Sequence, residues 1–278
     1  MDFRLAWATD PGLHREKNED SVLVWQDRAG VDVLVVIADG MGGHAAGQLA
    51  SSIAIDVLSQ ELEKDGGSGC SPNRLHSAFL KANSAVLTAS RTVPHASGMG
   101  TTLTVAALRD GKLGLLNVGD SPAYLIREAR AQMITEDHSW AAEQVRLGVI
   151  TAKEAKHHPF KHRLTRAVGV WEEVDAYTAE LEIAEGDLLV VCSDGVESAG
   201  VEVDEVQRFL DSDDLERACD EIIACCRDRG APDNVTVAAV RLGDRPASLR
   251  DTVRISTGHQ LGEMKDLDGG AALTDTHI

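Results

Sequence analysis

Four aspartates stand where apolar runs end or begin, and their carboxylates are the groups in this sequence best suited to chemistry. The runs VVIA, LLNVG and LLVVCS lead into Asp39, Asp120 and Asp194, and Asp233 stands just before the run VTVAAV. In an antiparallel sheet the end of one strand lies beside the start of its neighbour, so the four carboxylates can converge at one edge. Each aspartate taken alone has another interpretation, because Asp and Asp-Gly are common in turns after strands.

Converging carboxylates imply a bound cation, because unpaired negative charges repel one another strongly at short range. The five cysteines have no regular spacing, and no Cys/His pair has the spacing of a zinc site. An oxygen-only ligand set favours hard ions. We therefore expect Mg²⁺ or Mn²⁺ rather than Zn²⁺.

A charged segment supplies a cation and two more carboxylates. Arg15, Glu19 and Asp20 lie within REKNED, directly before a strand expected at Ser21–Trp25. One interpretation is a solvated charged loop. The functional interpretation assigns Glu19 and Asp20 to metal-bound water and Arg15 to an anionic substrate. A guanidinium matches phosphate with two parallel hydrogen bonds, which suits a phosphate ester.

The glycine-rich stretch GMGGHA at 40–45 also satisfies the dinucleotide pattern G-x-G-x-x-A between a strand and a helix. Two observations argue against that interpretation. The dinucleotide fold needs a returning parallel strand after the helix, whereas a second helical pattern follows here. Asp39 would also place a carboxylate beside the pyrophosphate.

The elements that position these residues follow from the apolar pattern. We expect further strands at 33–38, 101–108, 112–118, 121–127, 176–183, 188–192 and 235–242. We expect longer helices at 45–64, 73–91 and 213–226. Because the first two helices follow one another directly, the pattern favours antiparallel sheets packed between helical layers.

Two stretches differ in character from the rest. Residues 138–169 are polar and histidine-rich, with short helical patterns at 140–147 and 152–156, and are expected to form an insertion over one face of the sheet. Residues 243–278 contain few large apolar side chains, so we expect a flexible tail.

Composition excludes several classes of function. The net charge of −18 argues against nucleic acid as a partner, because phosphate contacts need clustered Lys and Arg. No run approaches the roughly 20 apolar residues that span a bilayer, and the first ten residues are not those of a secretory signal. The unpaired cysteines are typical of a reducing compartment. We expect a cytoplasmic protein without membrane contact, and a monomer by default.

Taken in order, these segments resemble the bacterial branch of the PPM-type metal-dependent Ser/Thr protein phosphatases, the protein phosphatase 2C-like family. The matching stretches cover roughly residues 4–242, and they are GLHREKNEDS, IADGMGGHAAG, the MGTT of 99–102, VGDSPAYLI, TEDHS, the TRAVG of 165–169, CSDGVES and DNVTV. The resemblance implies an α+β fold, a four-layer α-β-β-α sandwich of two antiparallel sheets flanked by helix pairs. It also implies a phosphatase domain at 1–242, with 138–169 as a mobile flap.

The resemblance assigns a role to each matched aspartate. Asp39 is expected to bridge two Mn²⁺ or Mg²⁺ ions. The backbone carbonyl of Gly40 is expected to bind one ion, and Asp194 and Asp233 the other. These residues would activate a water molecule for attack on a phosphoserine or phosphothreonine of a protein substrate.

Further residues complete the implied site. Asp20, with Glu19, is expected to hold the second ion through water. Asp120 matches a position that binds a third, weaker ion together with Asp194. Arg15 is expected to bind the phosphoryl oxygens and to offset their developing charge.

Four positions depart from the family pattern or have no assigned role. Met41 stands where eukaryotic relatives have a histidine that is thought to protonate the leaving group, so the general acid is unassigned. His44 and His138 are interpreted as structural residues. Ser198 replaces an acidic residue that usually follows the SDG motif, with Glu197 beside it.

Two alternatives to an active protein phosphatase are considered. A catalytically silent regulator on this fold would bind phosphoproteins, but such a protein would be expected to lose metal ligands. A phosphatase of a partner-switching system would usually carry appended sensor domains, which we do not expect in this chain. By family habit the partners are a cognate Ser/Thr kinase and its substrates.

Overall fold

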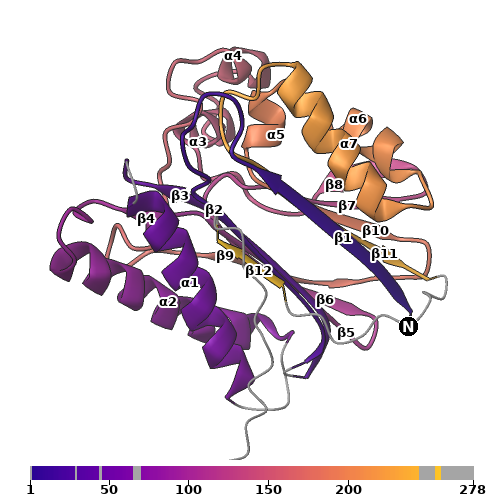
Figure 1. Cartoon of the computed structure of the whole chain (residues 1–278), viewed down its shortest axis with the longest axis horizontal. Helices are drawn as coiled ribbons and strands as arrows, with labels where there is room; N and C mark the ends of the chain where they lie inside the picture. The colour runs from indigo at the N-terminus through magenta and orange to yellow at the C-terminus, as the bar shows by residue number, and fades with distance from the viewer. Residues whose placement is uncertain (1, 29, 44–45, 65–69, 244–253, 258–278) are drawn as a thin grey trace, which may run out of the picture.

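Two antiparallel sheets lie face to face at the centre of the molecule, with helices on both outer sides (Figure 1). The computed structural model describes residues 2–28, 30–43, 46–64, 70–243 and 254–257. The larger sheet has the strand order β12-β2-β3-β5-β6-β9, with β4 paired to β3. Its strands are β2 (Asp20–Arg28), β3 (Val31–Met41), β4 (Gly100–Thr101), β5 (Leu103–Arg109), β6 (Lys112–Val118), β9 (Tyr177–Glu182) and β12 (Arg254–Thr257).

The second sheet has five strands in the order β1-β11-β10-β7-β8. They are β1 (Phe3–Asp10), β7 (Ala123–Arg127), β8 (Arg130–Met133), β10 (Leu188–Cys192) and β11 (Val235–Leu242). The central strand β10 is buried along its whole length, as its unbroken apolar sequence LLVVC predicts.

A helical layer covers the outer face of each sheet. The long helices α1 (Ala46–Glu63) and α2 (Pro72–Thr92) pack on the larger sheet, and Leu58 and Phe79 are completely buried there against β3 and β6. Helices α5 (Gly195–Ser198), α6 (Val203–Leu210) and α7 (Leu215–Asp228) pack on the five-stranded sheet. A third apolar core, which includes Ile37 and Val191, fills the space between the sheets. These layers confirm the expected α-β-β-α sandwich.

Residues 138–169 lie beside one end of the sheets, next to α5 (Figure 1). They contain α3 (Trp140–Arg146), which Ser139 caps, and α4 (Ala152–Lys156), which begins with a capping box from Thr151 and Glu154. A bridge between Ser139 and Leu164 closes the segment at its base.

The structure adds elements that the apolar pattern did not predict, namely β1, β8, α5, α6 and β12. The predicted flexible tail falls mostly at 244–253 and 258–278, outside the described residues. Its described part, Arg254–Thr257, pairs with β2 and forms the edge of the larger sheet. Among the described residues, no helix has both the length and the apolar character needed to cross a bilayer.

Candidate metal centre

The strand register places the predicted carboxylates at one end of the two sheets. Asp20 begins β2 and lies directly opposite Asp39, near the end of β3. Asp194 precedes α5 just after β10 ends, and Asp233 lies two residues before β11. Because β10 and β11 are antiparallel neighbours, the end of one strand adjoins the start of the other.

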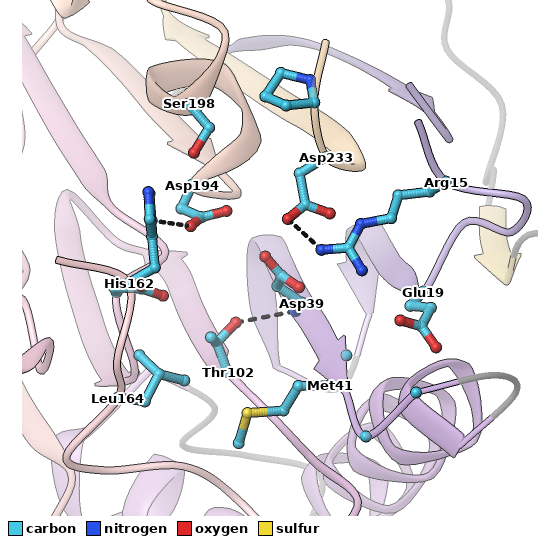
Figure 2. A pocket seen from close by; sticks show the side chains of 15 residues that line it. Arg15, Glu19, Asp39, Met41, Thr102, His162, Leu164, Asp194, Ser198 and Asp233 are labelled. Atoms are coloured by element: carbon cyan, nitrogen blue, oxygen red, sulfur yellow. Dashed lines mark hydrogen bonds and ion pairs between the residues drawn. The ribbon is translucent and has the colours of Figure 1, made fainter. Parts of the chain in front are cut away.

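The site itself is a pocket of about 520 Å³ at this end of the sheets. In Figure 2 the carboxyl groups of Asp39, Asp194 and Asp233 point into the same space. Every predicted site residue except Asp20 lines this pocket, and the full lining is Arg15, Glu19, Asp39, Gly40, Met41, Gly42, Gly43, Thr102, Asp120, His162, Leu164, Asp194, Ser198, Pro232 and Asp233.

Asp20 lies behind the pocket wall and is 1% exposed. Its Oδ2 accepts hydrogen bonds from the hydroxyls of Ser193 and Thr236, at 2.8 and 2.6 Å. Its Oδ1 is buried and has no hydrogen-bond partner, as is also true of Glu19 Oε1. Buried carboxylate oxygens without donors are costly unless a cation is bound nearby, so these two atoms fit a metal centre.

Burial and mutual repulsion raise the pKa values of Asp20, Asp39 and Asp120. Burial, followed by the charges of Asp20, Asp194 and Asp120, raises the pKa of Asp39 well above its usual value. Burial also raises the pKa of Asp20 to about 7, with Asp194 adding to the effect. The pKa of Asp120 is raised by burial and then by the charge of Asp194. Divalent cations would remove this repulsion, and the all-oxygen carboxylate set is the one that Mg²⁺ and Mn²⁺ prefer.

This repulsion predicts an unusual pH dependence of stability in the presence of a chelator. Between about pH 5.5 and 7 the folded protein retains a proton on Asp20 that the unfolded chain has already released, and the pKa values of Asp39 and Asp120 are raised in the same direction. The free energy of unfolding should therefore fall as pH rises through this window, by roughly 1–2 kcal/mol. Urea denaturation at several pH values measures the slope. Saturating Mn²⁺ should abolish or reverse it, since metal and protons compete for the same oxygens. An equal slope with Mn²⁺ and with chelator would contradict this explanation.

Arg15 extends over the pocket and contacts Asp233 (Figure 2), with Nη2 2.8 Å from Oδ2. Its side chain remains about half exposed at the rim of the pocket. Asp233 Oδ1 accepts the backbone N–H of Asn234 at 2.9 Å. The guanidinium thus lies beside the carboxylates, where it can reach an anion held by metal ions.

Gly40 allows helix α1 to approach the end of β3 closely. A Cβ atom at Gly40 would lie 2.1 Å from the carbonyl oxygen of Gly47 and 2.6 Å from that of Glu19. No other residue type fits here without moving backbone. The backbone of Gly40 also pairs with Thr101 of β4 and donates to Glu19 O at 3.2 Å.

Gly40→Ala should therefore destabilise the fold by about 1–3 kcal/mol through overpacking. Chemical denaturation in excess chelator measures this loss separately from metal binding. Gly186→Ala is the matched control, because a Cβ there meets nothing within 4 Å and only the positive φ of +89° opposes it. If Gly40→Ala lost no stability, the close approach at Gly40 would not constrain the fold.

His162, in the 138–169 segment, lines the pocket but was not predicted as a site residue from the sequence. Its Nδ1 lies 3.1 Å from Asp194 Oδ2, and this contact raises the pKa of His162. One ligand atom each from Asp120, His162 and Asp194 lie within 4.8 Å of one another, a spacing that suits a metal ion. No motif marked His162, because only the fold of the segment brings it to the pocket.

Other positions noted in the sequence have different surroundings. Met41 and Ser198 line the pocket, and Glu197 lines an adjoining cavity of about 390 Å³ beneath α3 and α4. His138 is completely buried away from the pocket. His44 lies outside the described residues. Thr102, from the MGTT stretch, accepts the backbone N–H of Asp39 through its hydroxyl at 2.9 Å.

Comparison with known proteins identifies the family. The sequence model of protein phosphatase 2C matches residues 14–239. This chain belongs to the protein phosphatase 2C family. The serine/threonine protein phosphatase PstP of Mycobacterium tuberculosis is 36% identical over 242 residues, which are 87% of this chain and 45% of PstP. The chain therefore spans less than half the length of that relative.

One further relative and the isolated catalytic domain of PstP resemble the chain over most of their own length. The serine/threonine phosphatase Stp of Listeria monocytogenes is 32% identical over 84% of this chain and 93% of Stp. The crystal structure of the PstP catalytic domain with two manganese ions has a TM-score of 0.76 and 33% identity. It covers 87% of this chain and 99% of that domain.

Proposed function

We propose that this chain is a metal-dependent protein phosphatase that hydrolyses phosphoserine and phosphothreonine in proteins. The observation that carries the proposal is the convergence of Asp39, Asp120, Asp194 and Asp233 on one pocket, with Arg15 at its rim. The two manganese ions of the related PstP domain support the choice of cofactor, Mn²⁺ or Mg²⁺.

The ligands are assigned as follows. Asp39 would hold both ions, because its carboxylate lies among those of the other aspartates and accepts no hydrogen bond from another described residue. The carbonyl of Gly40 would hold one ion, and Asp194 and Asp233 the other. The chemistry that such ions would supply is activation of a water nucleophile at neutral pH.

The remaining carboxylates act around this pair. Glu19 lines the pocket, and Asp20 lies behind it opposite Asp39. Their unpaired oxygens would hold water molecules around the ion at Gly40. Asp120 and Asp194 would hold a third, weaker ion, and His162 lies beside both.

Arg15 binds the phosphoryl group of the substrate. Its guanidinium orients two phosphoryl oxygens and stabilises the negative charge that grows on them as the ester bond breaks. In the described structure the same group pairs with Asp233, so Arg15 is already held over the pocket.

The substrates are phosphorylated proteins, and a cognate Ser/Thr kinase with its targets is the proposed functional partner. We place the enzyme in the cytoplasm as a monomer, with residues 1–242 as the phosphatase domain, 138–169 as a flap and 243–278 as a tail. A silent phosphoprotein-binding regulator is not favoured, because the chain retains Arg15, Asp39, Gly40, Asp194 and Asp233.

Hydrolysis assays test the proposal. Purified protein should hydrolyse p-nitrophenyl phosphate and a phosphothreonine peptide with Mn²⁺, lose this activity in excess chelator, and regain it when Mn²⁺ is restored. A phosphotyrosine peptide of the same sequence should be a poorer substrate. Binding of the phosphothreonine peptide without Mn²⁺-dependent turnover would instead support the silent regulator.

A further inference from the structure

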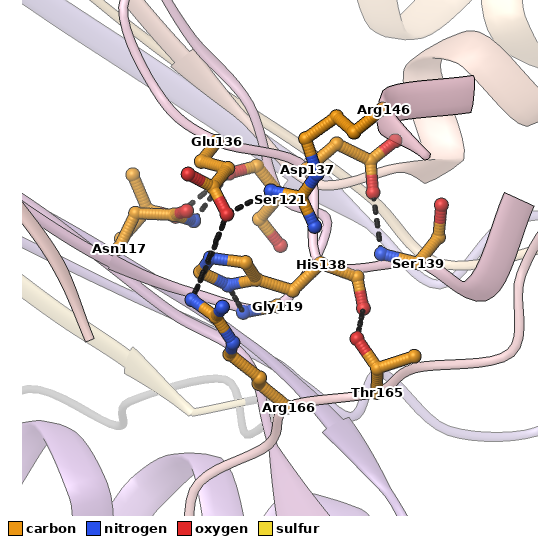
Figure 3. A network of polar contacts seen from close by, with 11 residues as sticks. Asn117, Gly119, Ser121, Glu136, Asp137, His138, Ser139, Arg146, Thr165 and Arg166 are labelled. Carbon is orange, nitrogen blue, oxygen red and sulfur yellow. Dashed lines mark hydrogen bonds and ion pairs between the residues drawn. The ribbon is translucent and has the colours of Figure 1, made fainter. Parts of the chain in front are cut away.

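A buried histidine joins the loop that carries Asp120 to the base of the 138–169 segment (Figure 3). His138 is completely buried. Its backbone N–H donates to the carbonyl of Gly119 at 3.1 Å, and the backbone N–H of Gly119 lies 3.1 Å from His138 Nδ1. His138 therefore holds both polar backbone groups of the residue immediately before Asp120.

The same histidine also holds the other end of the 138–169 segment. Its carbonyl oxygen accepts both the N–H and the hydroxyl of Thr165, each at 2.8 Å. Glu136 and Arg166 approach the outer ring nitrogen, Nε2, at 3.5 and 2.9 Å. His138 is thus a junction between the pocket and the base of the segment.

The hydrogen-bond geometry assigns the proton on the ring. A neutral imidazole offers one lone pair and one N–H, so Nδ1 and Nε2 cannot both accept. The backbone N–H of Gly119 has no freedom to turn away, whereas the Arg166 side chain can shift toward Glu136, 3.6 Å away. We therefore take Nδ1 as the acceptor, which leaves Nε2–H between Arg166 Nη1, at 2.9 Å, and Glu136 Oε1, at 3.5 Å.

The surroundings keep this imidazole neutral. Burial, reinforced by the positive charge of Arg166, lowers the pKa of His138 to about 4. At neutral pH the lone pair on Nδ1 is available to Gly119. The ring is consequently a fixed acceptor and takes no part in proton transfer.

The position of the Asp120 carboxylate depends on the bonds between His138 and Gly119, because no other described residue donates a hydrogen bond to that carboxylate. The direction of the side chain is set by its backbone, and Gly119 has a φ of +106°. A Cβ on Gly119 would lie 2.6 Å from the methyl group of Thr102. The loop therefore has an unusual backbone conformation, which the two bonds to His138 hold in place.

We propose that His138 is a positioning residue that aims the Asp120 carboxylate at Asp194 through the bond between its Nδ1 and Gly119 N–H, and so sets the affinity for the third ion. This inference rests on the proposed function, which assigns that ion to Asp120 and Asp194. The ring contacts neither the ion nor the substrate.

Three substitutions distinguish the loss of the hydrogen bond between His138 Nδ1 and Gly119 N–H from the loss of packing. The side-chain oxygen of His138→Asn can occupy the place of Nδ1, whereas that of His138→Gln reaches only the place of Nε2. His138→Leu matches asparagine in size and accepts no hydrogen bond. Titration of each full-length variant with Mn²⁺, followed by electron paramagnetic resonance and calorimetry, resolves tight sites from a weak one.

The weak-site dissociation constant should rise about tenfold or more in His138→Leu and His138→Gln, as is usual when a residue supporting a metal ligand is lost. It should stay close to the wild-type value in His138→Asn, with tight binding retained in all three. His157→Asn makes the same change at an exposed position of the segment and should alter nothing. If His138→Leu does not fold, the weak-site dissociation constants of His138→Asn and His138→Gln still test the proposal.

Equal weakening in all three variants, or an unaffected weak site in both Leu and Gln, would overturn the inference. Asp120→Asn separates this failure from failure of the ligand assignment. If Asp120→Asn abolishes weak binding while the His138 variants bind normally, only the role of His138 is wrong. If Asp120→Asn leaves weak binding intact, the third-ion site is misassigned and the inference fails with it.

Discussion

Asp39→Asn should lower kcat/KM for p-nitrophenyl phosphate by at least about 10³-fold, equivalent to about 4 kcal/mol of transition-state stabilisation. Asp39 is the proposed bridge, and its carboxylate lies among those of Asp20, Asp120, Asp194 and Asp233. An amide cannot supply the negative charge that holds two cations together. Without the pair of ions, water is not activated at neutral pH.

The stability of Asp39→Asn without metal should change in the opposite direction to its activity. In excess chelator, Asp39→Asn should be more stable than wild type, because the amide replaces a carboxyl group that must either take up a proton on folding or be buried as a charge beside its acidic neighbours. Added Mn²⁺ should then raise its melting temperature less than that of wild type. Asp32→Asn, near the start of the same strand, is the matched control and should change neither quantity. Full activity in Asp39→Asn would remove Asp39 from the mechanism.

Arg15→Gln should reduce kcat/KM by about 10- to 100-fold, the loss expected when one or two hydrogen bonds to a charged group disappear. The effect should differ from that of Asp39→Asn, because Mn²⁺ still binds. Arg15→Lys keeps the charge but cannot form two parallel hydrogen bonds to phosphate, so it should recover only part of the loss.

Steady-state kinetics at saturating Mn²⁺, with calorimetry for metal affinity, distinguish these outcomes. Arg91→Lys is a suitable control, since Arg91 forms an exposed ion pair with Glu172. If Arg15→Gln lost Mn²⁺ affinity and not catalysis, Arg15 would be a structural partner of Asp233 and not a phosphate ligand.

Much of the site could be predicted from sequence because its residues belong to strands with simple patterns. The apolar runs before Asp39 and Asp194 define buried strands, and a strand must end where the chain turns. Antiparallel pairing then brings such ends together. The exact register, in which Asp20 faces Asp39, is not visible in the sequence because it depends on side-chain packing along β2 and β3.

The missed features have physical reasons as well. His162 reaches Asp194 only because the 138–169 segment folds back on itself, and His162 lies outside the two short helical patterns of that segment. Strand β1, FRLAWATD, mixes polar and apolar residues, since it is buried only in part. Helix α6 has eight residues, of which only Val206 and Leu210 are buried, so its apolar stripe is too short to stand out.

The most direct test of the central claim is anomalous diffraction at the manganese edge from crystals grown with Mn²⁺. We expect two strong peaks in the pocket, with Asp39 between them and Asp194 and Asp233 beside one, and a weaker peak at Asp120. A single peak away from Asp39, or no peak within the pocket at saturating Mn²⁺, would contradict a two-metal centre.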